Sequence, residues 1–133
     1  MNYRYYVSNW FIPRGQIALN IGPITIIKKD WFNKANAKTK TYILRHQYIH
    51  YQQWLKRPWT HHWKYWLNLE YRFDCEIEAY AHNVINDKTS KKWIVDFCYQ
   101  NYANLGYDML TKTTIKKTLE KKIMKLNWGK DGS

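Results

Sequence analysis

The chain has 133 residues and carries 22 Lys and Arg against 10 Asp and Glu, which gives a formal net charge of +12. At this length one hydrophobic core is the default, and a composition of 45% apolar and 24% charged residues excludes wholesale disorder. Two cysteines are too few for a disulfide scaffold or a four-cysteine zinc site. We therefore expect a single domain over residues 1–128 and a frayed tail over residues 129–133.

The sequence also bears on the compartment in which the protein works. No apolar run follows Arg4, which predicts no signal peptide, and no stretch approaches the roughly 18 apolar residues that span a bilayer. We expect a cytoplasmic or virion-associated protein with no transmembrane segment.

Two β-branched, apolar segments come first in the predicted fold. Residues 16–21 and 24–27 flank Gly22-Pro23, which predicts two strands joined by a tight turn, or one kinked strand. Residues 31–37 are predicted to form a loop.

Helical spacing dominates the rest of the chain. The segment from His61 is either one helix or two with a bend near Arg72, and residues 87–89 offer a cap for the helix that follows. The helices are expected over residues 39–56, 61–86, 87–103 (cap included) and 113–126. The fold class is therefore α+β, with a small N-terminal β-hairpin or edge-strand unit packed on about four helices.

The charge of the chain reverses in one place. Residues 1–72 hold twelve basic and two acidic residues, and residues 88–133 hold ten and four. Residues 73–87 between them hold four acidic residues and no Lys or Arg. Such an island is either a solvated helix face or a place where carboxylates gather to hold a cation.

A histidine pair precedes this acidic island. His46 and His50 are four residues apart, so on a helix both imidazoles can reach one metal ion. A pair of partly buried, hydrogen-bonded histidines is the alternative. If the next helix folds back antiparallel, Glu76 or Glu78 could supply a third ligand and leave the open fourth position of a catalytic zinc site.

Three segments resemble the zincin metallopeptidases of the gluzincin branch. They are the edge strand at residues 21–26, the His-x-x-x-His helix at residues 44–53 and the Glu-x-Glu-Ala helix at residues 75–81. The similarity covers residues 15–83, about half of the chain, and implies a minimal zincin-like fold.

The resemblance also implies a set of site residues. His46, His50 and Glu76 would bind Zn²⁺, with Glu78 as the fallback ligand. The activity would be that of a hydrolase that cleaves peptide bonds with a zinc-activated water. A peptide or protein substrate or partner would pair with the strand from Ile24 to Ile27.

The chain departs from the family at the catalytic position, where Gln47 replaces the glutamate that acts as general base. A carboxamide has no titratable group near neutral pH, and loss of a general base costs about 10²–10⁴-fold in rate. Three explanations stay open: a non-catalytic relative, a different base such as Glu78 or Glu70, or an engineered Glu→Gln change.

Two other groups are less promising ligands. His61 and His62 are adjacent, so on a helix their rings point about 100° apart, and a surface or capping role is expected. Cys75 could be a soft ligand, but a free buried cysteine is the commoner fate.

A second class of function competes with the metal site. Runs that mix basic and aromatic residues, such as residues 56–59 and 64–66, could stack on single-stranded nucleic acid and neutralise it. The alternative is then a non-enzymatic basic protein that binds nucleic acid or assembles into a larger particle, such as a phage or virus. In that case the histidines and carboxylates form only a buried polar network.

Overall fold

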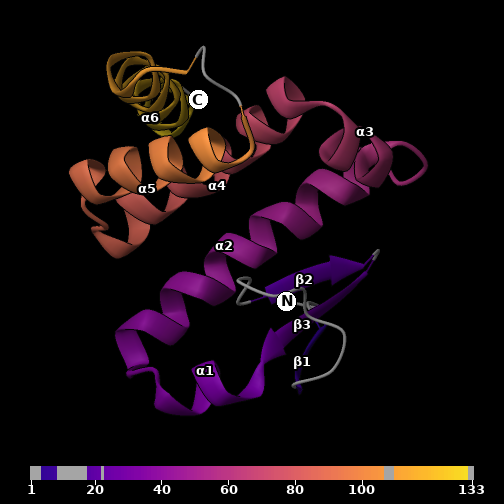
Figure 1. The fold of residues 1–133 in the computed structure, drawn as a ribbon. Coiled ribbons are helices and arrows are strands. Elements are labelled where there is room, and N and C mark those ends of the chain that lie inside the picture. The colour runs from indigo at the N-terminus through magenta and orange to yellow at the C-terminus, as the bar shows by residue number, and fades with distance from the viewer. Residues whose placement is uncertain (1–3, 9–17, 22, 107–109, 132–133) are drawn as a thin grey trace. The chain divides into compact units, whose positions relative to one another are not determined.

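The computed structural model describes residues 4–8, 18–21, 23–106 and 110–131. Over these residues it is α+β, as the sequence predicts, with a small three-stranded sheet and six helices rather than about four (Figure 1). The chain divides into two compact units, residues 1–67 and 68–133, and each is described here by itself. The single domain over residues 1–128 stays a prediction.

The sheet of the first unit consists of β1 (Arg4–Ser8), β2 (Ala18–Ile21) and β3 (Ile24–Lys28). β2 and β3 are antiparallel, with Ile21 opposite Ile24 and Ala18 opposite Ile27, which confirms two strands rather than one kinked strand. The first two residues of the predicted strand 16–21, and Gly22 of its turn, lie outside the described residues.

The strand from Ile24 to Ile27 was predicted to be an edge strand, and this is wrong. The order of the described strands is β1-β3-β2, so β3 lies in the middle. β1, which the sequence did not predict, runs parallel to β3, with Arg4 opposite Ile24. Because β3 already has a backbone neighbour on each side, a peptide cannot add to it by strand pairing.

Three helices complete the first unit: α1 (Lys29–Lys34), α2 (Ala37–Lys56) and α3 (His61–Leu67). Residues 31–34 are thus helical, not loop as predicted. Asn36 caps α2 because its side chain accepts a hydrogen bond of 2.8 Å from the Thr39 backbone N–H. α2 packs against the sheet through β2 and β3 (Figure 1), which sets its inward face beside those strands.

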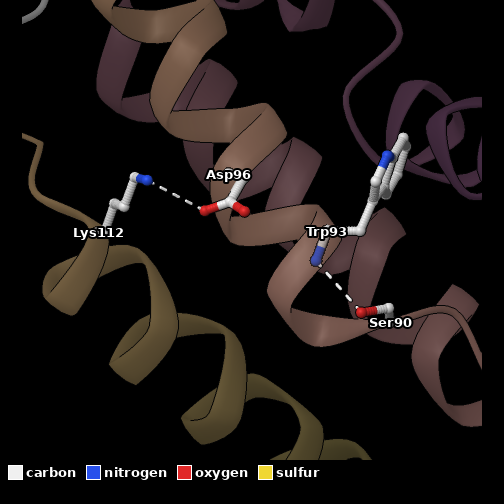
Figure 2. A network of polar contacts seen from close by, with 4 residues as sticks. All are labelled: Ser90, Trp93, Asp96 and Lys112. Carbon is white, nitrogen blue, oxygen red and sulfur yellow. Dashed lines mark hydrogen bonds and ion pairs between the residues drawn. The ribbon is translucent and has the colours of Figure 1, made fainter.

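The second unit is formed by α4 (Leu69–Asp87), α5 (Lys91–Asn104) and α6 (Lys112–Asp131). Asn68 caps α4, so the segment from His61 forms two helices that separate before Arg72. Ser90, rather than a residue of 87–89, caps α5 by accepting a 3.2 Å hydrogen bond from the Trp93 backbone N–H (Figure 2). α6 continues to Asp131, so residues 129–131 of the predicted tail are helical, and residues 132–133 lie outside the described residues.

The core of the second unit is apolar. α6 contributes Ile115, Leu119 and Ile123, which are all buried against α4 and α5. Each such side chain stabilises the fold by about 1.5–3 kcal/mol relative to its exposed state. At the surface, Lys112 of α6 lies 3.2 Å from Asp96 of α5 (Figure 2). Among the described residues, no helix is long and apolar enough to cross a membrane.

Candidate metal centre

Helix α2 carries both histidines of the predicted pair on its buried face. His46 and His50 are one turn apart, and their Nε2 atoms lie 3.2 Å from each other. In a tetrahedral zinc site with Zn–N bonds of about 2.0–2.1 Å, two nitrogen ligands lie roughly 3.3 Å apart. The separation therefore suits two ligands of one ion, and it suits equally a direct N–H···N hydrogen bond between the rings.

A glutamine one turn further on fixes the tautomer of one ring. The Nδ1 atom of His50 lies 2.8 Å from Oε1 of Gln53, which is also buried. An amide oxygen only accepts hydrogen bonds, so Nδ1 of His50 carries the proton and donates it. In the tautomer with its proton on Nδ1, the ring has its lone pair on Nε2, the atom that faces His46. This is the arrangement in which a histidine binds a metal through one nitrogen and is oriented through the other.

Gln53 is a functional candidate that sequence reasoning missed. Its position three residues after His50 puts it on the same face of the helix, and that spacing was the signal available. Many residues share such spacing, so only the contact with His50 sets Gln53 apart.

An aromatic ring contacts each histidine of the pair. Tyr42 stacks on His46 with ring centroids 6.1 Å apart, and Tyr65 of α3 meets His50 edge-on at 5.8 Å. These rings limit the ways in which the imidazoles can turn, because interior side chains are closely packed.

His61 is buried, although the sequence predicted a surface or capping role for it. It begins α3 and is 3% exposed, so it does not have the surface role expected for it. Burial, followed by the charges of His62 and His50, lowers the pKa of His61 to about 4. Its ring is therefore neutral at pH 7. His62 is half-buried, and burial lowers its pKa as well.

The side chain of Gln47 is hydrogen-bonded to the sheet. Its Oε1 accepts a hydrogen bond from Nδ2 of Asn20 on β2, and Oδ1 of Asn20 accepts one from the hydroxyl of Thr25 on β3. Gln47 and Thr25 are both buried, so this chain of hydrogen bonds fixes the orientation of the Gln47 carboxamide. A carboxylate in place of Gln47 could accept the same hydrogen bond from Asn20.

The predicted carboxylates lie on α4 in the second unit. Glu76 is half-buried, and its charge helps raise the pKa of Cys98 to about 12 and the pKa of Tyr102, although burial is the main cause for both. Glu78 lies 3.5 Å from Nζ of Lys122 on α6. Glu70, the other suggested base, is exposed.

Cys75 behaves as a buried thiol. It is free, and burial first, with the neighbouring carboxylates, raises its pKa to about 12. Metals bind the thiolate, so a thiol that stays protonated at neutral pH is a poor ligand. The expected fate of a free buried cysteine is confirmed.

His46 and His50 offer two buried imidazole donors to a metal ion, and Glu76 on α4 is the carboxylate predicted as the third donor. The histidines belong to the first unit and the glutamate belongs to the second. Imidazole and carboxylate donors bind zinc, and imidazole also binds copper, iron and nickel, so the donors alone do not specify the metal. Comparison of the chain with protein-family models, with curated proteins and with solved structures finds no match.

Proposed function

We propose that this chain is a zinc-binding, zincin-like protein in which His46, His50 and Glu76 hold one Zn²⁺. The observation that carries the proposal is the 3.2 Å approach of two buried Nε2 atoms, one of which belongs to a ring whose Nδ1 already donates to Gln53. Two His and one carboxylate are the ligand set of catalytic zinc sites with one open position.

Only one of Glu76 and Glu78 can be the third ligand, and the proposal assigns this role to Glu76. The two residues are two positions apart on α4, so they do not share a face of the helix and cannot both reach one ion. Glu78 is already engaged by Lys122, at 3.5 Å. Glu76 is therefore the proposed third ligand, with Glu78 as the fallback.

The proposed site lacks a general base. A zinc ion held there would supply Lewis-acid polarisation to a bound water or carbonyl group. Gln47 can orient a water by hydrogen bonding but cannot take its proton near neutral pH. We infer that the protein binds zinc and that its peptide hydrolysis, if any, is about 10²–10⁴-fold below that of an enzyme with a positioned base.

Metal analysis tests the site itself. Protein purified without a metal-affinity tag, stripped of metal and dialysed against zinc, should take up about one equivalent per chain. His46→Ala, His50→Ala and Glu76→Ala should each abolish this uptake. Glu78→Ala and the exposed Glu70→Ala, on the same helix as Glu76, should preserve it. Zinc far below stoichiometry in the unaltered protein would refute the proposal. Loss of zinc in Glu78→Ala but not in Glu76→Ala would show that Glu78, and not Glu76, is the third ligand.

A single substitution tests the account of the missing base. Gln47→Glu retains an acceptor for Asn20 and introduces a titratable carboxylate at the buried position. The zinc-loaded variant should hydrolyse members of a broad peptide panel faster than the unaltered protein. If zinc binds with unchanged stoichiometry and no hydrolysis is gained, the scaffold is a zinc-binding protein without latent peptidase activity.

A further inference from the structure

The segment over residues 55–67 exposes an unusual amount of apolar surface; we call it the tryptophan segment. Its most exposed large side chains are Trp59 (91%), Leu67 (78%), Trp63 (72%), Leu55 (51%) and Trp66 (46%). Scattered exposed apolar residues are ordinary, but five large ones within thirteen residues form a concentration that marks an interaction surface.

Helix α3 shows how this surface is formed. Trp63, Trp66 and Leu67 are three and four residues apart, so they lie on one face of the helix, and all three are exposed. His61 is buried and Tyr65 is half-buried. α3 therefore directs its tryptophans outward, the reverse of a helix that places its apolar face in the core.

The charge around these side chains has one sign. Lys56, Arg57 and Lys64 lie within the tryptophan segment and are exposed. No Asp or Glu occurs between Asp30 and Glu70 in the sequence. A surface that combines exposed apolar groups with basic groups is complementary to a partner that is both apolar and anionic.

We propose that the tryptophan segment binds the surface of anionic lipid membranes. Tryptophan is favoured at the boundary between headgroups and acyl chains, and Lys and Arg are attracted to anionic headgroups. Leu55 and Leu67 favour lipid over single-stranded nucleic acid, because a nucleic-acid base stacks on flat rings whereas an aliphatic side chain gains by leaving water. The tryptophans and leucines would enter the interface while the basic side chains contact the headgroups.

Vesicle sedimentation tests this proposal. Vesicles of phosphatidylcholine with phosphatidylserine should bind the protein, and vesicles of phosphatidylcholine alone should bind it at least about tenfold more weakly. The double variant Trp59→Ser/Trp63→Ser should lower partitioning into the anionic vesicles by at least about tenfold, because two large apolar side chains are removed. Trp128→Ser is the matched control, since Trp128 on α6 is also highly exposed and lies outside the segment, and it should bind as the unaltered protein does.

A second variant tests the contribution of the basic side chains separately from that of the apolar side chains. Lys56→Glu/Lys64→Glu, with its folding checked by circular dichroism, should lose binding to the anionic vesicles by more than about tenfold. Equal binding to both kinds of vesicle by all variants would overturn the proposal. So would the absence of vesicle binding together with binding of a single-stranded oligonucleotide that depends on Trp59 and Trp63, which would assign the surface to nucleic acid.

Discussion

The two units of the chain bury different kinds of side chain. Among the described residues, six of the seven buried polar side chains belong to the first unit: Thr25, His46, Gln47, His50, Gln53 and His61. Fourteen of the seventeen buried apolar ones belong to the second unit, where Asn83 is the one buried polar side chain described. Buried polar groups destabilise a fold unless they are hydrogen-bonded. The second unit is therefore stabilised mainly by apolar packing, whereas the first unit retains a buried polar cluster that costs stability unless its groups are hydrogen-bonded.

The largest expected effect breaks the packing of the second unit. Leu119→Ala removes a fully buried side chain of α6 and should lower the free energy of unfolding by about 2–5 kcal/mol. Chemical denaturation of the metal-free protein measures this change. The exposed Met124 on the same helix is the control, and Met124→Ala should change stability by less than about 0.5 kcal/mol. Equal effects of the two substitutions would contradict the apolar core described for this unit.

The next effect concerns the polar cluster of the first unit. Gln53→Leu removes the acceptor for Nδ1 of His50 and should weaken zinc binding by about 10–100-fold. Gln53→Glu keeps an acceptor and should bind zinc at least as well as the unaltered protein. Isothermal titration with zinc measures both, with Gln52→Leu as a control because Gln52 is exposed on the same helix. Equal affinities in Gln53→Leu and Gln52→Leu would show that Gln53 does not orient the ligand.

A pH effect follows from His61. Its pKa is lowered to about 4 in the folded state, below the ordinary histidine value of 6.5, so the folded protein disfavours the charged ring. As pH falls from about 6.5 to about 4, the unfolded chain gains a proton that the folded chain does not, and stability falls. Thermal unfolding of the metal-free protein across this window should show the loss, and His61→Gln should reduce it. An unchanged pH profile in His61→Gln would place the sensitivity elsewhere.

The smallest effect is expected at the surface of the second unit. Lys122→Ala removes the partner of Glu78, and both side chains are about a quarter exposed, at 28% and 24%. Ion pairs of this kind contribute about 0–1 kcal/mol, so the free energy of unfolding should fall by no more than that. A larger loss by chemical denaturation would mean that the pair is part of the packing.

The spacing of residues along the sequence predicted features of the fold that depend only on near neighbours in the chain. The histidine pair on α2 follows from two residues four apart, and both lie on the buried face of the helix. β1 was missed because it pairs with β3, twenty positions further along the chain, and no local pattern encodes such a partner. α1 was missed because six residues are too few for a helical period to stand out.

The polar contacts of the candidate site were beyond sequence reasoning for a different reason. Whether Gln53 meets His50, or Asn20 meets Gln47, depends on side-chain rotamers and on how α2 sits against the sheet. The same holds for His61, which looked like a surface residue beside His62 but is buried. The spacing of residues in the sequence indicates which side chains can contact each other, and the packing of the folded chain determines which of these contacts form.

We propose that His46 and His50 bind one zinc ion through the two Nε2 atoms that face each other. Nuclear magnetic resonance of the imidazole nitrogens during a zinc titration tests it most directly. The Nε2 resonances of both rings should shift until one equivalent of zinc is added, while Nδ1 of His50 stays protonated. A titration that shifts only His61 and His62, or no imidazole nitrogen at all, would contradict it.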